Sequence, residues 1–282
     1  MEPLNGAKLR EILEECGFSF SKSLGQNFLS DERILTRIAD DASLETGDTV
    51  LEIGPGAGTL TRVMARKAKK VVSVEIDRSL QPVLARTLSG FTNTEVIFGD
   101  FLRMDLPRLF AEHLEDGFKV VANLPYYITT PIIMRLLESR MPCRSLTILV
   151  QREVAQRMAA KPGTPEYGSL SCVVQYYADC RLQTRLSPAC FTPRPKVESQ
   201  VITLNILPVP SVSVKDEKML FRVIHSAFAM RRKTFANNLI HEFSLSREDA
   251  ETLLAQCALP AQIRGECLSL SQLALVSDAL SK

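Results

Sequence analysis

Three glycines at alternate positions follow a short apolar stretch in the first fifth of the chain. Gly54, Gly56 and Gly58 come directly after residues 49–53, a predicted strand that contains the acidic residue Glu52. Glycine has no Cβ, so a strand that ends in glycines lets its backbone approach a ligand closely. The N–H groups at the start of the following helix then face the polar groups of that ligand. The spacing therefore predicts a binding site for a small polar ligand at the end of this strand.

Three more polar residues stand where further apolar stretches end: Glu75, Asp100 and Asn123. In open parallel sheets, ligands bind outside the carboxyl ends of the strands. An acidic residue about 20 positions after a glycine turn, as Glu75 is, accepts hydrogen bonds from ribose hydroxyls. A carboxylate at Asp100 can accept the amine of an adenine. We expect these residues to meet at one edge of a sheet and to bind a nucleoside-containing cofactor.

The acidic residue and its glycines form the pattern Glu52-x-Gly54-x-Gly56-x-Gly58. This pattern resembles the cofactor loop of S-adenosylmethionine-dependent methyltransferases. The dinucleotide fingerprint is G-x-G-x-x-G, but here the third glycine comes one residue early and Thr59 holds the later position. The resemblance implies S-adenosylmethionine as the cofactor.

A second motif, Asn123-Leu124-Pro125-Tyr126, follows the stretch 118–122. It resembles the signature of enzymes that methylate exocyclic amines of nucleic-acid bases. An adenine N6 amine is a poor nucleophile because its lone pair is delocalised into the ring. Acceptors on both amine hydrogens, the Asn123 side-chain oxygen and the Leu124 carbonyl, would draw the nitrogen toward tetrahedral geometry. Pro125 restricts the backbone here, and Tyr126 offers a flat face for the base.

The elements that position these motifs alternate between strands and helices. This alternation predicts βαβ units and therefore a doubly wound, Rossmann-like α/β sheet. The expected strands are 49–53, 71–75, 94–98, 118–122 and 145–150, and the expected helices are 7–16, 31–41, 58–69, 79–88, 130–139 and 152–159. A further β-rich hairpin is expected from residues 170–178, 180–186 and 199–207.

Two prolines, Pro208 and Pro210, interrupt the chain after this hairpin. The periodicity beyond them is helical throughout, over about 215–229, 232–241, 246–257 and 269–280. We therefore expect a methyltransferase domain at 1–207 and a small α-helical, RNA-binding domain at 208–282.

The composition is that of an ordinary globular protein, with 45% hydrophobic and 23% charged residues. A formal net charge of +2 does not indicate nucleic-acid binding by itself. Seven cysteines without framework spacing indicate reduced thiols, and three unclustered histidines predict no metal site. No apolar run reaches the roughly 18 residues of a membrane span. We expect a cytoplasmic monomer.

Several motifs occur together in one order, and the combination resembles the ribosomal RNA adenine dimethyltransferase family over roughly residues 16–240. These motifs are the leading loop 24–29, the glycine loop, Asn123–Tyr126, residues 191–199 (Phe-Thr-Pro-Arg-Pro-Lys-Val-Glu-Ser) and residues 228–239. The small-subunit branch of the family is the nearest. That resemblance implies dimethylation of two adjacent adenosines near the 3′ end of 16S rRNA, with the rRNA or the small ribosomal subunit as the partner.

The resemblance also implies roles for individual residues. Backbone groups of Asn27 and Leu29 would contact the cofactor, with Gly54 at its methionine portion, Glu75 at the ribose and Asp100 at the adenine. Asn123 would serve both cofactor and target amine, and Phe191 would form the pocket wall opposite Tyr126. The candidate phosphate contacts are Arg194, Lys196, Arg231, Arg232 and Lys233.

Three alternatives remain at this point. A 23S rRNA adenine methyltransferase that confers macrolide resistance shares the motifs, but such relatives typically have Ser where this chain has Gly25, and a shorter tail. A non-catalytic relative acting in ribosome assembly or transcription would not need the intact Asn123–Tyr126 motif. A nicotinamide-dependent oxidoreductase is disfavoured by the glycine spacing.

Overall fold

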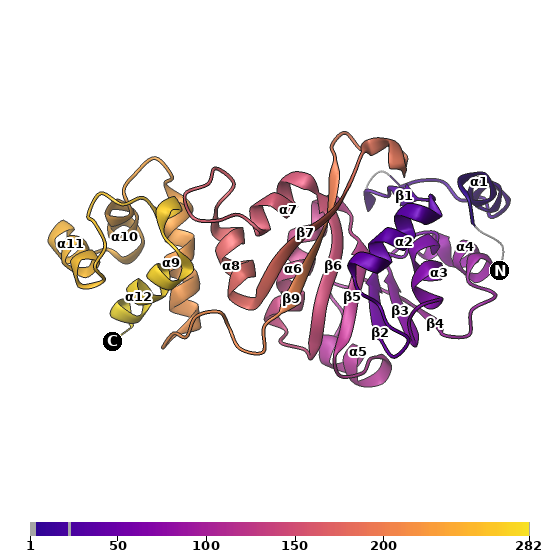
Figure 1. Ribbon diagram of the computed structural model, residues 1–282, viewed down its shortest axis with the longest axis horizontal. Helices are drawn as coiled ribbons and strands as arrows, with labels where there is room; N and C mark the ends of the chain where they lie inside the picture. Colours follow the sequence, from indigo (N-terminus) through magenta and orange to yellow (C-terminus); the bar gives the residue numbers. More distant parts are fainter. Residues whose placement is uncertain (1–3, 22–23, 282) are drawn as a thin grey trace. The chain divides into compact units, whose positions relative to one another are not determined.

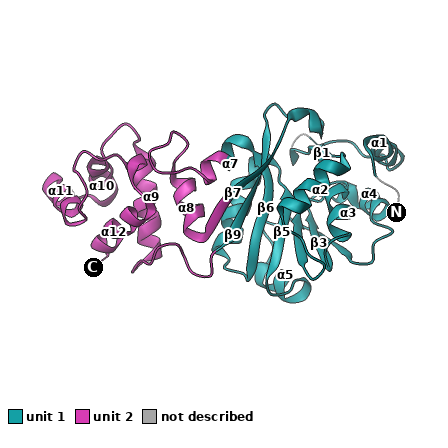
Figure 2. Cartoon of the chain, in the orientation of Figure 1, with its two compact units in different colours: residues 1–155, 181–206 teal, residues 156–180, 207–282 magenta. Residues whose placement is uncertain are grey.

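The computed structural model describes residues 4–21 and 24–281. Lys22 and Ser23, directly before the leading loop 24–29, lie outside the described residues. The chain forms two compact units, shown in Figure 2: unit 1 comprises residues 1–155 and 181–206, and unit 2 comprises 156–180 and 207–282. The predicted division at 207/208 lies one residue from a unit boundary, whereas residues 156–180, expected in the first domain, belong to unit 2. The functional division into a cofactor domain and an RNA domain stays a prediction.

Unit 1 is built on a seven-stranded sheet with the strand order β4-β3-β2-β5-β6-β9-β7. The five strands from β4 to β6 are parallel, and β9 runs antiparallel to β6. This arrangement confirms the predicted α/β class. The strands are β2 (Thr49–Ile53), β3 (Lys70–Glu75), β4 (Thr94–Phe98), β5 (Phe118–Asn123), β6 (Cys143–Gln151), β7 (Ala178–Leu186) and β9 (Ser199–Ile206).

Helices cover this sheet (Figure 1), and their apolar residues form its core. They are α1 (Gly6–Glu15), α2 (Glu32–Asp41), α3 (Thr59–Ala65), α4 (Gln81–Thr87), α5 (Leu106–His113), α6 (Thr129–Glu138) and α7 (Arg152–Met158). All five residues of β2 are buried, as expected for a central parallel strand with both faces covered. The sequence did not predict α5, although Asp105 caps its first turn through a 3.2 Å bond from the Arg108 N–H.

A short two-stranded sheet joins the leading segment to a distant loop. Strand β1 (Phe28–Leu29) pairs antiparallel with β8 (Phe191–Thr192), which places Leu29 opposite Phe191. The connection between β7 and β9 thereby lies beside the segment that precedes α2.

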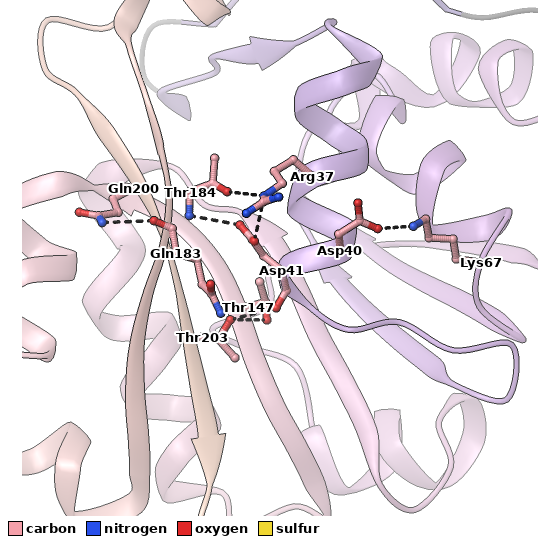
Figure 3. A network of polar contacts seen from close by, with 9 residues as sticks. All are labelled: Arg37, Asp40, Asp41, Lys67, Thr147, Gln183, Thr184, Gln200 and Thr203. Atoms are coloured by element: carbon pink, nitrogen blue, oxygen red, sulfur yellow. Dashed lines mark hydrogen bonds and ion pairs between the residues drawn. The ribbon is translucent and has the colours of Figure 1, made fainter.

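A polar network fixes the strands that carry this loop (Figure 3). The Asp41 carboxylate, at the end of α2, accepts a 3.2 Å bond from the Thr184 N–H and lies 3.4 Å from the Arg37 guanidinium. The Thr203 hydroxyl donates to the Asp41 carbonyl at 3.4 Å and lies 3.1 Å from the Thr147 hydroxyl. Helix α2 is thus joined to β6, β7 and β9, so the loop between β7 and β9 leaves from a fixed base.

Unit 2 takes in the end of α7, the loop 159–168 and the first residues of β7. Its helices are α8 (Ser169–Tyr177), α9 (Glu217–Ala229), α10 (Phe235–Phe243), α11 (Arg247–Gln256) and α12 (Leu270–Leu280). The helices beyond residue 214 match those predicted. Gly265 packs so closely that an added Cβ would lie 1.9 Å from the Ala227 carbonyl oxygen. Only glycine fits where this turn crosses α9.

The predicted strand over 170–178 is wrong, because these residues form α8. The stretch is rich in Val and Tyr, which favour strands. Burial decides against that preference: Ser171, Val174 and Tyr177 are buried at a spacing of three residues, which places them on one face of a helix, and the Tyr177 ring packs against Phe221 of α9. None of the helices formed by the described residues is long and apolar enough to cross a membrane.

Candidate active site

A pocket of about 1000 Å³, counting the part open to solvent, lies at the carboxyl ends of β2 to β5 in unit 1. The structure brings all six predicted cofactor residues to its wall: Asn27, Leu29, Gly54, Glu75, Asp100 and Asn123. Gly54, Glu75, Asp100 and Asn123 lie at or just after the ends of β2, β3, β4 and β5, as the parallel topology requires, whereas Asn27 and Leu29 come from the leading segment at β1.

Glu75 is held at the end of β3 by two backbone donors. Its carboxylate accepts bonds from the Gly56 N–H at 3.0 Å and the Asp77 N–H at 2.8 Å. Burial raises the pKa of Glu75, and these two donors oppose that effect. Each oxygen keeps a further lone pair, so the group can still accept from a diol.

The glycine loop needs its glycines for two reasons. Gly54 has φ +72°, and no atom lies within 4 Å of the position that a Cβ would take, so the backbone faces open space. Gly56 has φ +56°, and an added Cβ would lie 2.8 Å from Cε1 of Phe28. The first glycine leaves room beside the pocket, and the second admits the leading segment.

Glu52 is a buried carboxyl beneath this loop and also lines the pocket. One of its oxygens accepts bonds from the Thr61 hydroxyl at 2.6 Å and the Ser73 hydroxyl at 2.8 Å. Burial, with a smaller contribution from the charge of Glu75, raises the pKa of Glu52 to about 7. The glycine pattern marked the position of this residue, but its partners could not be read from the sequence.

The leading segment closes one side of the pocket through polar bonds. The Gln26 amide donates to Asp77 at 2.7 Å, and the Asn27 amide donates to the Gly25 carbonyl at 3.0 Å. The Asn123 amide nitrogen donates to the Asn27 carbonyl at 3.0 Å. This bond fixes the orientation of the Asn123 amide and leaves its oxygen with no donor among the described residues.

The residues after Asn123 form a rigid turn at the pocket. Leu124 and Tyr126 both line it, so the structure brings three of the four predicted catalytic residues together. The Tyr126 hydroxyl lies 2.6 Å from the Ser199 hydroxyl. Burial raises the pKa of Tyr126, so it stays a neutral phenol. The Thr129 hydroxyl donates to the Pro125 carbonyl at 3.0 Å, which ties the turn to the start of α6.

Phe191, the fourth, is placed differently. It is 2% exposed, packs in the core cluster with Leu29 and Leu186, and is not among the residues that line the pocket. It stands next to the pocket through its pairing with Leu29. Its role as a wall for the target base stays a prediction, and one that requires its side chain to leave the core cluster.

Arg194 and Lys196 are exposed on the loop between β8 and β9. The end of that loop is held by Glu198, whose carboxylate binds Arg152 at 2.9 Å and Arg185 at 2.5 Å. The two exposed cations are therefore presented on a loop anchored at both ends.

The basic triple after α9 does not act as one set. The Arg231 guanidinium donates to the Pro165 carbonyl at 3.0 Å and lies 3.6 Å from Glu266, so it braces a loop within unit 2. Arg232 and Lys233 are exposed on the turn before α10. The sequence grouped the three as phosphate contacts, and that role stays a prediction.

The titratable residues that line the pocket are acidic. Among the described residues that line it are the carboxyls of Glu52, Glu75 and Asp100, and no Lys, Arg or His. The described residues also contain no cluster of His, Cys, Asp or Glu that could hold a metal ion. The site therefore suits a ligand that carries a nucleoside and net positive charge.

Comparison with known proteins agrees with this geometry. The model of the ribosomal RNA adenine dimethylase family matches residues 17–266, and the chain belongs to this family. The chain is 47% identical over 278 residues to the ribosomal RNA small subunit methyltransferase A of Anoxybacillus flavithermus, covering 97% of this chain and 94% of that protein. It is 46% identical over 277 residues to the protein of the same name from Alkaliphilus oremlandii, covering 98% and 96%.

Two solved structures share the fold. The 23S rRNA methyltransferase ErmE is 26% identical with a TM-score of 0.71, covering 91% of this chain and 100% of that one. A dimethyladenosine transferase from Plasmodium falciparum is 23% identical with a TM-score of 0.73, covering 88% and 95%. The Rossmann-like methyltransferase architecture is therefore shared over nearly the whole chain.

Proposed function

We propose that this protein transfers methyl groups from S-adenosylmethionine to the N6 amines of two adjacent adenosines near the 3′ end of 16S rRNA, giving N6,N6-dimethyladenosine. The observation that carries the proposal is the fixed Asn123 amide. Its nitrogen is bound by the Asn27 carbonyl, so its oxygen is free to accept from an incoming amine.

The pocket residues fit the cofactor. Gly54 offers open backbone where an extended chain could lie, Glu75 can accept from ribose hydroxyls, and Asp100 can accept an adenine amine. The acidic lining of the pocket, without Lys, Arg or His among the described residues, suits the net positive charge of S-adenosylmethionine. When bound, this cofactor supplies the electrophilic methyl group, so the protein has to position and activate the amine.

Two acceptors would activate the target nitrogen. The Asn123 side-chain oxygen and the Leu124 carbonyl each take one amine hydrogen, which draws the nitrogen lone pair out of the ring. Tyr126 would stack on the base, with its ring held in place by Ser199. Because these bonds strengthen as positive charge develops on the nitrogen, they act mainly in the transition state.

The substrate assignment rests on the two curated relatives, whose names specify the small ribosomal subunit. The target base has to leave its stack to enter the pocket. Arg194, Lys196, Arg232 and Lys233 would contact rRNA phosphates. A cytoplasmic monomer acting on the small subunit or its precursor is the form we propose.

Small subunits from cells that lack adenine dimethylation provide the test. The purified protein and S-adenosylmethionine should add four methyl groups per subunit, and mass spectrometry of nuclease fragments should place them on the two adenosines. Asn123→Ala should reduce turnover by two orders of magnitude or more while RNA affinity changes little, because one acceptor on the amine is lost. Asn205→Ala is the matched control, since Asn205 faces Ser145 at the opposite end of the sheet.

The likeness to a 23S rRNA methyltransferase makes large subunits the competing substrate. Both subunits are offered in parallel with equal concentrations of enzyme. Methylation of 23S rRNA alone would overturn the proposal, and so would wild-type turnover by the Asn123→Ala variant.

A further inference from the structure

Tyr127 is an unusually exposed aromatic side chain at the mouth of the pocket. It is 60% exposed and yet lines the pocket. Of the large hydrophobic side chains that the described residues expose, only Tyr127 and Ile76 also line this pocket. Tyrosine combines a large apolar ring with a polar tip and is enriched at binding surfaces, so an exposed ring at the mouth of a pocket is a candidate contact for a bound molecule.

The ring is supported on one side. It lies against Gly25 of the leading segment, where an added Cβ would come within 3.3 Å of the Tyr127 Cδ1 and 3.4 Å of its Cε1. Gly25 has φ +60°, a conformation that favours glycine, so this close approach is built into the local backbone. The ring is thus backed on one side and exposed to solvent elsewhere.

The adjacent tyrosine is held in another way. Tyr126 binds Ser199 through its hydroxyl at 2.6 Å, whereas Tyr127 has no hydrogen bond to any described residue. Both belong to the short turn η3 (Tyr126–Ile128), so they leave the backbone at neighbouring positions. Two aromatic residues therefore stand in sequence at the pocket, one fixed inside it and one exposed at its mouth.

We propose that Tyr127 is the stacking platform for the nucleobase next to the target adenosine. The inference rests on the proposed function and deepens it. When one base enters the pocket, its neighbour is a single nucleotide away and has lost its stacking partner. Single-stranded bases are commonly held on aromatic faces, because every base has a π-face.

Two exposed cations follow the strand that pairs with the leading segment. Strand β1, three residues after Gly25, pairs with β8, and β8 leads directly into the loop with Arg194 and Lys196. A strand bound over Tyr127 would have cations nearby for its phosphates. A fixed platform takes the neighbour on one side of the target, so one of the two adjoining adenosines would lie on Tyr127 while the other is methylated.

A double-mutant cycle on enzyme and RNA tests the inference. The enzymes are the wild type, Tyr127→Ala and Tyr127→Phe. The substrates are small subunits reconstituted with 16S rRNA that keeps one target adenosine. The nucleotide on its 5′ side or on its 3′ side is either adenosine or an abasic nucleotide. Single-turnover methylation at subsaturating subunit concentration is measured for each pair by mass spectrometry.

We expect Tyr127→Ala to slow methylation about five- to hundredfold on the adenosine-flanked substrate, the range for loss of one base stack. Tyr127→Phe should keep the wild-type rate because it keeps the ring. When the abasic nucleotide replaces the neighbour that stacks on Tyr127, the wild type and Tyr127→Ala should methylate the target at the same rate. Leu182→Ala, which truncates an exposed side chain of β7 outside the pocket, is the control for general surface effects.

Equal penalties for Tyr127→Ala on flanked and abasic substrates, on both sides, would overturn the platform. So would a wild-type rate for Tyr127→Ala on the flanked substrate. The cofactor affinity and the melting temperature of each variant are measured first. If Tyr127→Ala weakens cofactor binding or lowers the melting temperature, the ring serves the cofactor pocket or the fold, and the inference is wrong. If instead the wild-type enzyme fails on every small-subunit substrate, the proposed function fails.

Discussion

Replacing Glu52 with glutamine should change how the stability of the protein depends on pH. The Glu52 carboxyl is fully buried, and burial raises its pKa from 4.5 to about 7. The folded state therefore binds a proton more tightly than the unfolded state does. Stability that this group contributes is fully present below pH 4.5 and is lost as the pH rises through 7.

The magnitude follows from the two pKa values. A change from 4.5 to about 7 corresponds to about 3 kcal/mol, at about 1.4 kcal/mol for each pH unit. Glu52→Gln keeps an oxygen to accept from Thr61 and Ser73 and removes the titration. The unfolding free energy of the variant, relative to wild type, should therefore rise by about 3 kcal/mol between pH 4.5 and pH 8.

Urea unfolding followed by circular dichroism at half-unit intervals of pH measures this difference. Other carboxyls titrate in both proteins and largely cancel in the comparison. Glu75 is the charged neighbour that raises the pKa of Glu52, so Glu75→Gln should move the wild-type transition to lower pH. Glu45→Gln, at an exposed carboxyl, is the matched control. Parallel curves for Glu52→Gln and wild type, within about 0.5 kcal/mol, would refute the argument from burial.

Three further outcomes are expected. Glu75→Ala removes a buried acceptor for ribose hydroxyls, and a hydrogen bond to a charged group is worth about 1.5–3 kcal/mol. Calorimetry should therefore show at least tenfold weaker S-adenosylmethionine binding, with an unchanged circular dichroism spectrum. An unchanged affinity would show that Glu75 does not bind the cofactor. Gly56→Ala places a Cβ against Phe28 at positive φ, so both the melting temperature and cofactor affinity should fall, and a wild-type value for both contradicts the close packing. Neutralising Arg232 and Lys233 together should lower the slope of log affinity for rRNA against log salt concentration by up to about 0.7–0.9 per lost phosphate contact. An unaltered slope would show that the two side chains are solvated and do not contact phosphates.

The sequence predicted the parts of the fold that local patterns determine. Strands β2, β3 and β5, which carry Glu52, Glu75 and Asn123, were predicted within a residue of their observed bounds, because apolar runs bounded by glycine or polar residues leave few alternatives. Parallel topology then places their ends at one edge, which is the part of the pocket wall that β2, β3 and β5 supply.

Features that depend on distant partners were not predictable. Residues 170–178 carry strand-forming side chains, and only the packing of Tyr176 and Tyr177 on Phe221 makes them a helix. In the sequence, Arg231 is one of three consecutive cations with no visible difference between them. In the structure it differs from the other two because it binds the Pro165 carbonyl and lies beside Glu266. In both cases the deciding contact lies at least 35 positions away in the chain.

The two tyrosines of the Asn123 motif show the same limit at the functional site. In the sequence Tyr126 and Tyr127 are identical neighbours, and local propensity cannot distinguish them. The structure separates them through residues far away: Ser199, 73 positions on, fixes the first ring by its hydroxyl, and Gly25 supports the second from the leading segment. In the sequence, Gly25 only distinguishes the small-subunit branch of the family from the 23S rRNA methyltransferases. Its contact with Tyr127 gives it a physical role, because a side chain there would come into tight contact with the ring and change how the pocket mouth is presented to RNA.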